Sequence, residues 1–210
     1  MTLLFLKKMK KKQLEMLLQK IPEFQKAKPE MEQYLTPAPI AADVLFTATQ
    51  YGDIENKIVV DLGCGTGIFS IGAYICGAAQ VVGFDIDCDC INQARDYAFG
   101  NNYNVNFMIE RVRNVNTVCD TVIMNPPFGA QKSNIRADRA FIEKGFQISA
   151  VIYFLCLSKT IPFIEKMVSA LNGKIDLKKD YIFKMKHTFD FHEKKSQDFD
   201  VSLLRILTKK

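Results

Sequence analysis

One ten-residue segment constrains the fold of this chain more than any other part of it. Residues 59–68 read VVDLGCGTGI, in which a hydrophobic run ends in an aspartate and passes into three alternating glycines. Glycine is needed where the backbone turns sharply or must let a ligand approach closely. The segment therefore predicts a buried strand, a tight turn and the start of a helix, which is the opening unit of a doubly wound α/β fold.

Short strand-like runs alternate with longer helix-like segments along the rest of the chain. We predict strands at residues 57–61, 80–85, 105–109, 121–124, 150–155, 174–186 and 199–207. We predict helices at residues 9–20, 39–51, 68–76, 88–100, 137–147 and 161–172. This order predicts an α/β, Rossmann-like, seven-stranded doubly wound sheet with helices on both faces, whose ligands bind at the carboxyl ends of the strands. We divide the chain into a basic N-terminal arm, residues 1–36, and one domain, residues 37–210.

Composition narrows the class of protein. With 210 residues, of which 48% are hydrophobic, the chain can bury one sizeable core. No apolar run approaches the roughly eighteen residues of a membrane span, so we expect no membrane segment. The six cysteines include no CxxC pair, so we expect no metal site and a reducing, cytoplasmic location.

The formal net charge is +5, and the positive side chains are unevenly placed. Five lysines fall within residues 7–12, and His192, Lys194 and Lys195 form a second group. Such groups suit a phosphate backbone, so nucleic acid is a candidate partner. A solvated face on a lysine-rich protein explains the same residues at least as well, so charge alone does not identify a partner.

The glycine loop does not fit a phosphate-containing cofactor. A dinucleotide site would need glycine at the position that Ile68 occupies, and no Lys-Ser/Thr pair follows the loop to cradle phosphates. The spacing of Asp61, Gly63, Gly65 and Gly67 resembles instead the loop of class I methyltransferases, which bind S-adenosylmethionine, a cofactor without phosphates. A glycine-rich turn without a ligand is the alternative.

The second predicted strand ends in Asp85, which is followed by Ile86. An acid at this place accepts hydrogen bonds from ribose hydroxyls in related sheets, so Asp85 is our candidate ribose ligand. Asp87 and Asp89 could substitute for it, although capping of the next helix is the commoner role for such acids.

The fourth predicted strand leads directly into the tetrad Asn125, Pro126, Pro127 and Phe128. The exocyclic amine of adenine is a poor nucleophile, and an enzyme that methylates it must hold the nitrogen in line and accept its hydrogens. The side-chain oxygen of Asn125 and the Pro126 carbonyl suit this role because the prolines fix the backbone. Phe128 offers a face on which a base can stack. A rigid turn after a strand is the alternative explanation.

Together these motifs resemble the methyltransferase-like protein five family of archaea and eukaryotes, which methylates N6 of an adenine in small-subunit ribosomal RNA. The resemblance covers nearly the whole chain from Met9 onward. Its marks are residues 32–37, 61–67, 83–87, 122–129, 138–141 and 191–195.

The resemblance implies site residues beyond the motifs themselves. Gln33 and Thr36 would close over S-adenosylmethionine, and Gly63, Thr66 and Ile68 would line its methionine end. A helix cap followed by proline is an equally good explanation for Thr36, and both roles can coexist.

Two positions depart from the family pattern. After the third predicted strand a polar residue would normally meet the adenine of the cofactor, and Glu110 and Arg111 are the candidates. The family commonly carries aspartate where Arg111 stands and histidine where Cys156 stands. The sequence therefore does not identify which residues contact the adenine of the cofactor.

The resemblance also implies a partner, a small zinc-binding methyltransferase activator subunit. The aliphatic run at residues 81–84 could give that subunit an apolar sheet edge, although the same residues are explained equally well as core.

RNA is the favoured substrate. The side chains expected around an RNA strand are Lys132, Arg136, Arg139, His192, Lys194 and Lys195. Three alternatives remain: methylation of DNA, methylation of a glutamine in a release factor, and a catalytically silent RNA-binding subunit.

Overall fold

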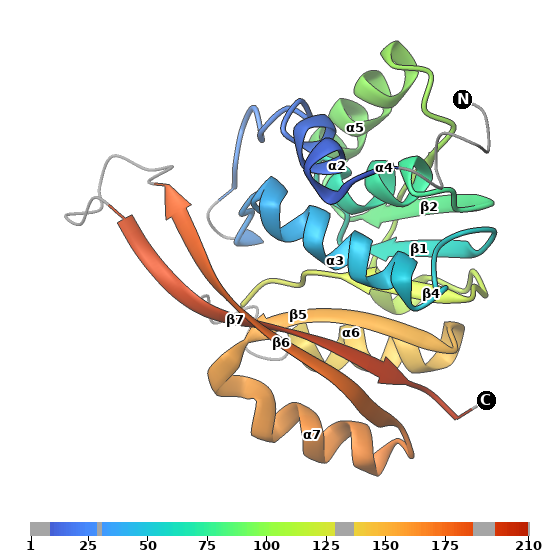
Figure 1. Cartoon of the computed structure of the whole chain (residues 1–210), viewed down its shortest axis with the longest axis vertical. Helices are drawn as coiled ribbons and strands as arrows, with labels where there is room; N and C mark the ends of the chain where they lie inside the picture. Colours follow the sequence, from blue (N-terminus) through green and yellow to red (C-terminus); the bar gives the residue numbers. More distant parts are fainter. Residues whose placement is uncertain (1–8, 29–30, 129–136, 187–195, 210) are drawn as a thin grey trace.

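The computed structural model describes residues 9–28, 31–128, 137–186 and 196–209. These form one seven-stranded sheet in the order β3-β2-β1-β4-β5-β7-β6 (Figure 1). The strands are β1 (Ile58–Leu62), β2 (Gln80–Asp85), β3 (Asn106–Ile109), β4 (Thr121–Met124), β5 (Val151–Leu157), β6 (Lys174–Lys186) and β7 (Ser196–Leu207). The first five are parallel, and β7 runs antiparallel to both of its neighbours, β5 and β6.

The helices are α2 (Lys11–Leu18), α3 (Ala38–Gln50), α4 (Ile68–Ile75), α5 (Cys88–Gly100), α6 (Ala137–Ile148) and α7 (Ile161–Ala170), with short 3-10 turns η2 (Val112–Asn114) and η4 (Ser158–Thr160). Residues from α2 to α5 form one hydrophobic core against the sheet, and residues from α6 and α7 form a second. The sheet therefore has helices on both faces, which confirms the predicted fold class.

Strand order decides where the sheet has an edge. Residues 81–84 lie in β2, between β1 and β3, and Val81 and Phe84 are almost fully buried. The suggestion that this run forms an exposed edge is therefore wrong, because a buried central strand and an apolar edge have the same local pattern. The two edge strands are β3 and β6, and in β3 the side chains of Met108 and Ile109 are each 49% exposed.

The N-terminal helix α2 packs against the body of the protein. Its Leu14 and Leu18 are buried in the core shared with α3 and α4. Asp43 on α3 accepts hydrogen bonds from Lys11 of α2 at 2.8 Å and from Tyr181 of β6 at 2.7 Å. Polar contacts thus connect the first described helix to the sixth strand, while the division of the chain at residue 36 stays a prediction.

A buried polar cluster fastens β7 to the segment that precedes β1. Asp53 accepts hydrogen bonds from Arg205 Nε at 2.8 Å and from the Tyr153 hydroxyl at 2.6 Å. Because Arg205 and Asp53 are both buried, each neutralises a charge on the other that would otherwise be costly to bury.

In the part of the chain that the structure describes, no helix is long and apolar enough to cross a membrane.

Candidate methyl-donor and acceptor site

The glycine loop lies between β1 and α4 at the carboxyl end of the sheet. Gly63, Gly65 and Gly67 have φ angles of +73°, +53° and +89°, which side chains with a Cβ rarely adopt. A Cβ on Gly67 would lie only 2.8 Å from the ring of Phe107. The alternating glycines are therefore required both by the backbone conformation and by the rings packed against the loop.

Two buried oxygen atoms near this loop are available to a ligand. Asp61 Oδ2 accepts hydrogen bonds from the amide and hydroxyl of Ser70, at 2.9 and 2.6 Å. Its other oxygen, Oδ1, and Thr66 Oγ1 are buried without a hydrogen-bond partner among the described residues. Burial raises the pKa of Asp61 to about 7, and the nearby charge of Asp85 adds to the rise. Buried polar atoms are normally paired, so this geometry indicates that a bound molecule completes the pairing.

Asp85 shapes the loop from the end of β2. Its Oδ2 accepts a hydrogen bond from the Gly65 amide at 2.9 Å, and its Oδ1 accepts one from the Asp87 amide at 3.0 Å. Burial raises the pKa of this carboxyl, against the effect of those two hydrogen bonds. A carboxylate has about four acceptor positions, so Asp85 can still receive hydroxyl donors. The adjacent Ile86 is 46% exposed.

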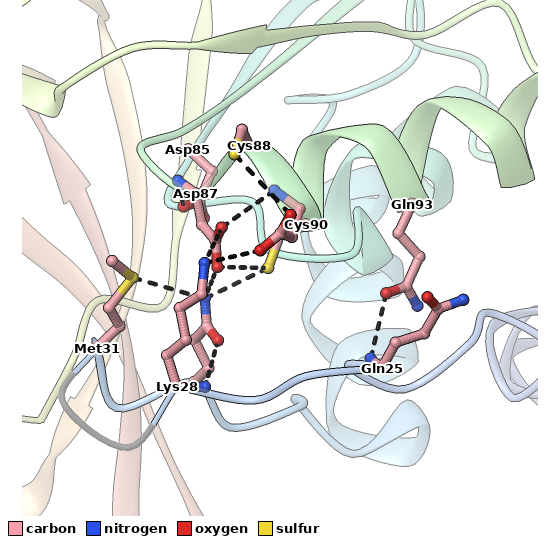
Figure 2. Close-up of polar contacts among 10 residues, drawn as sticks. Gln25, Lys28, Met31, Asp85, Asp87, Cys88, Cys90 and Gln93 are labelled. Atoms are coloured by element: carbon pink, nitrogen blue, oxygen red, sulfur yellow. Dashed lines mark hydrogen bonds and ion pairs between the residues drawn. The ribbon is translucent and has the colours of Figure 1, made fainter.

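A segment of the N-terminal region, residues 21–28 and 31–36, crosses this end of the sheet; we call it the strap. Figure 2 shows its polar contacts with the start of α5. Lys28 Nζ and Gln33 Nε2 each lie 2.6 Å from a carboxylate oxygen of Asp87. Phe24 of the strap packs on the loop, where a Cβ on Gly65 would lie 3.0 Å from its ring.

Asp87 caps the N-terminus of α5, as its place before the predicted helix suggested. Its side chain accepts a hydrogen bond from the Asp89 amide at 3.1 Å at the start of α5. Burial opposes its ionisation, but the hydrogen bonds from Lys28 and Gln33 outweigh burial and lower the pKa of Asp87. Asp87, Cys88 and Asp89 also bring possible metal-ligand atoms within 4.8 Å of one another. The Lys28 ammonium contacts the carboxylates of Asp87 and Asp89, so a positive charge already lies between these two possible metal ligands.

The tetrad follows β4 and meets the strap. Asn125 Nδ2 donates a hydrogen bond to Thr36 Oγ1 at 2.9 Å, while Asn125 Oδ1 is buried with no partner in the described part of the chain. Phe128 packs edge-on against Phe183 of β6, with ring centroids 5.9 Å apart, and tilted against Phe199 of β7. The β6–β7 pair therefore supports the aromatic ring of the tetrad.

Thr36 does not cap a helix. The N-cap residue of α3 is Pro37, and no side-chain cap hydrogen bond is present there. The cap explanation offered for Thr36 is therefore wrong, and its hydroxyl contacts Asn125 instead.

The segment after β3 brings Glu110 next to Asp85. The Glu110 amide donates to the Asp85 carbonyl at 2.9 Å, and the Glu110 carboxylate accepts from the Arg111 amide and from Asn114. Arg111 is exposed. Cys156 is fully buried in β5, so burial raises the pKa of its thiol.

Only one of the expected RNA contacts falls in a described part of the chain. Arg139 on α6 is exposed and forms an ion pair with Glu143 at 2.8 Å. The others lie outside the described residues: Lys132, Arg136, His192, Lys194 and Lys195.

Sequence reasoning missed four residues at this site. Lys28 and Phe24 of the strap contact Asp87 and the glycine loop. Phe141 of α6 packs against Gly63, where a Cβ would lie 3.1 Å from its ring. Burial, with the nearby charge of Glu32, raises the pKa of Asp138 on α6 to about 6. Asp138 and Phe141 belong to a segment noted as typical of the family, which is the one signal that singled them out.

The doubly wound sheet, its antiparallel seventh strand and the glycine loop between Asp61 and Asp85 define a class I methyltransferase. In agreement, residues 40–148 match the family described as methyltransferase small domain. The methyl donor of this class is S-adenosylmethionine.

Full-length relatives narrow the class to a family. The chain is 35% identical to the rRNA N(6)-adenosine-methyltransferase METTL5 of Danio rerio, over 94% of this chain and 98% of that protein. It is 38% identical to MJ0284 of Methanocaldococcus jannaschii, over 94% of each chain. The solved structure of PH1948 from Pyrococcus horikoshii is 34% identical, covers 96% of this chain and 99% of its own, and superposes with a TM-score of 0.88. The chain belongs to the METTL5 family of methyltransferases.

Methyltransferases that act on proteins match a smaller part of the chain. The ribosomal protein L11 methyltransferase of Aliivibrio salmonicida is 39% identical over 75 residues, which are 35% of this chain and 26% of that protein.

Proposed function

We propose that this protein transfers a methyl group from S-adenosylmethionine to the N6 amine of an adenine in RNA, with small-subunit ribosomal RNA as the target. One observation carries the proposal: Asn125 Oδ1 is a buried acceptor without a partner among the described residues, at the carboxyl end of β4. An amine that must lose a hydrogen while it is methylated needs such an acceptor. The names of the relatives from Danio rerio and Drosophila melanogaster, both rRNA N(6)-adenosine-methyltransferases, support the same reaction.

The residues around the loop fit S-adenosylmethionine. The unpartnered oxygens of Asp61 and Thr66 can receive the donors of its amino-acid end, and three glycines leave the backbone open to close approach. The proposed cofactor-binding residues are Gln33, Thr36, Asp61, Gly63, Gly65, Thr66, Gly67, Ile68, Asp85, Ile86, Glu110 and Arg111. When bound, the cofactor supplies an electrophilic methyl group on a positively charged sulfur.

The tetrad would hold the acceptor. Asn125 Oδ1 and the Pro126 carbonyl accept the two hydrogens of the amine, which fixes its nitrogen and draws electron density toward it. Pro126 and Pro127 restrict the backbone, so these acceptors keep their direction without substrate. Phe128, already supported by Phe183, offers a ring on which the base stacks. The bond from nitrogen to the methyl group forms as the bond from sulfur to that group breaks, and the N-methylated ammonium that results is acidic enough to release its proton to water. No charged general base is therefore needed.

A cavity of about 370 Å³ lies along the strap and the start of α3, where its lining includes Tyr34, Leu35 and Pro37. Its link to the tetrad is Phe183, which also lines the cavity and contacts Phe128. Arg139 provides positive charge on α6, and we include Lys132, Arg136, His192, Lys194 and Lys195 as proposed RNA contacts. These residues would bind phosphates without specifying sequence.

We further propose that the protein works in the cytoplasm as a heterodimer with a small zinc-binding methyltransferase activator subunit. The edge strand β3 supports this proposal, because Met108 and Ile109 are half exposed and Phe99 on α5 is 87% exposed. An unpaired strand edge beside exposed apolar side chains is a surface that a partner can cover.

The test is transfer of labelled methyl from S-adenosylmethionine to ribosomal RNA, to DNA and to a release factor, with and without the activator subunit. Wild type is compared with Asn125→Ala and with a control, Asn104→Ala, in which an exposed asparagine is removed. We expect N6-methyladenosine in RNA alone, from wild type and the control but not from Asn125→Ala. Label on a protein glutamine would show the release-factor reaction instead. Cofactor binding without any transfer would favour a silent RNA-binding subunit.

A further inference from the structure

The hydroxyl of Thr36 has an unusual partner for a threonine at the start of a helix. Such a hydroxyl ordinarily caps the helix by accepting a backbone amide. Here the backbone carbonyl of Pro37 accepts the amides of Ile40 and Ala41, and no side chain caps α3. The Thr36 hydroxyl, 4% exposed, instead accepts the side-chain amide of Asn125, 89 residues further along the chain.

That contact holds one end of the Asn125 amide and leaves the other end free. A carboxamide has an acceptor oxygen at one end and a donor nitrogen at the other, and a half-turn of the group exchanges them. With Nδ2 held 2.9 Å from Thr36, Oδ1 is the end left without a partner in the described residues. The hydrogens of an adenine amine need an acceptor. With the amide reversed, the Nδ2 hydrogens of Asn125 would face the hydrogens of the adenine amine, and no hydrogen bond could form.

We infer that Thr36 is a positioning residue for Asn125: its hydroxyl holds the side-chain amide in place through Nδ2, which leaves Oδ1 available to the amine of the substrate. The inference rests on the proposed function and deepens it. Thr36 acts through Asn125 and gives the tetrad its acceptor before substrate arrives. Such preorganisation lowers the barrier because no reorientation is needed during the reaction.

The position of Thr36 also connects two parts of the site. Three residues before it in the strap, Gln33 is bonded to Asp87 at the start of α5. The strap therefore reaches the cofactor side through Gln33 and the acceptor side through Thr36. The strap thus contacts Asn125 through Thr36 and the glycine loop through Phe24.

The experiment must separate this role from direct contact with the cofactor. Thr36→Val keeps the shape of the side chain but removes the acceptor, and Thr36→Ser keeps the acceptor. Thr36→Ala removes the same acceptor without placing a methyl group where the hydroxyl was, should valine disturb folding. The matched control is Thr49→Val in α3, where the hydroxyl donates to the Leu45 carbonyl away from the tetrad.

Three quantities are measured for the full chain with its activator subunit: kcat and KM for RNA, the dissociation constant for S-adenosylmethionine, and the ¹⁵N–¹H signal of the Asn125 side-chain amide. That signal is assigned by its disappearance in Asn125→Ala. For Thr36→Val we expect kcat to fall about tenfold or more, as after loss of one preorganised hydrogen bond. Thr36 is also among the proposed cofactor-binding residues, so the dissociation constant of the cofactor can rise, but we expect that rise to stay below about threefold and thus below the fall in kcat. Thr36→Ser should restore kcat, and Thr49→Val should match wild type.

The amide signal gives a readout that does not depend on turnover. In Thr36→Val the Asn125 side-chain protons should shift upfield and exchange faster, because they lose their acceptor. An unchanged kcat, an unchanged signal, or a loss confined to cofactor affinity would each overturn the inference. An inactive wild type would instead refute the proposed function, while the amide signal would still test the contact itself.

Discussion

The ammonium group of Lys28 lies 2.6 Å from a carboxylate oxygen of Asp87, 59 residues further along the chain. The same carboxylate accepts a hydrogen bond from the Gln33 side chain and caps α5. Asp87 lies two residues after Asp85, whose carboxylate accepts a hydrogen bond from the Gly65 amide in the glycine loop. The strap is thus fastened beside the proposed ribose ligand. We expect a cofactor bound at the glycine loop to be released faster when these contacts are weakened.

Lys28→Met should therefore speed cofactor release. The ion pair is partly exposed to solvent, and exposed pairs are weak, so we expect the dissociation rate of S-adenosylmethionine to rise only about two- to fivefold. Stopped-flow competition with an unlabelled analogue measures this rate. Lys20→Met, at an exposed position before the strap, should leave it unchanged. Equal rates in wild type and Lys28→Met would show that the strap does not retain the cofactor.

Two glycine substitutions should change stability in opposite directions. Gly67→Ala forces a side chain into a φ of +89° and against Phe107, so we expect a loss of about 1–3 kcal/mol in the free energy of unfolding. Gly100→Ala at the end of α5 meets nothing within 4 Å, so it should stabilise by about 0.5–1 kcal/mol. Denaturant melts measure both values. Stabilisation by Gly67→Ala would contradict the loop conformation described above.

The Asp61 carboxyl should make stability depend on pH. Its pKa is raised to about 7 in the folded protein, whereas an unfolded aspartate titrates near about 3.9. Between these values the folded chain keeps a proton that the unfolded chain has released, so its stability falls as the pH rises from about 4 to about 7.

Asp61→Asn removes that titration. Without cofactor, the Tm of Asp61→Asn minus that of wild type should increase between pH 5 and pH 8, by about 4 °C or more. Asp85, whose pKa is also raised, titrates in both proteins. Because its charge is coupled to Asp61, loss of the Asp61 charge lowers the pKa of Asp85, which changes the difference in Tm in the same direction. A difference in Tm that is constant across this range would mean that Asp61 is ionised throughout.

Arg139→Ala should separate RNA binding from stability. The side chain is 65% exposed and pairs with Glu143 four residues later, so its loss should lower stability by less than about 0.5 kcal/mol. If it contacts one phosphate of a single strand, the slope of log affinity against log salt should shrink by about 0.7. Fluorescence anisotropy over a salt series measures the slope, and the exposed Lys166→Ala on α7 serves as the control. Matching slopes in Arg139→Ala and wild type would remove Arg139 from the RNA surface.

Patterns local in the sequence predicted the elements well. The strand, turn and helix around the glycine loop appear where residues 59–68 placed them, because hydrophobic runs and glycine φ preferences act within a few residues. The predicted helix at 9–20 is found as Lys11–Leu18, and the last strand begins three residues earlier than predicted, at Ser196.

Relationships between distant segments could not be predicted in this way. The order of strands is a property of the whole sheet, so residues 81–84 gave no sign that β3 rather than β2 is the edge. The partner of Thr36 is 89 residues away, and the local pattern at a helix start favoured a cap. Lys28 was missed for the same reason. It is one lysine among several in its segment, and nothing in the neighbouring sequence indicates that it pairs with Asp87.

The position of β7 has a consequence for how the protein is made. Of the seven strands it is synthesised last, yet it lies between β5 and β6 and carries Arg205 to Asp53. Until Leu207 has emerged from the ribosome, β5 presents an unpaired edge and β6 has no neighbour in the sheet. Open strand edges pair readily with other chains. A nascent chain that stalls after β6 should therefore need protection from aggregation, and a fragment that lacks residues 196–207 should aggregate instead of folding as a smaller domain.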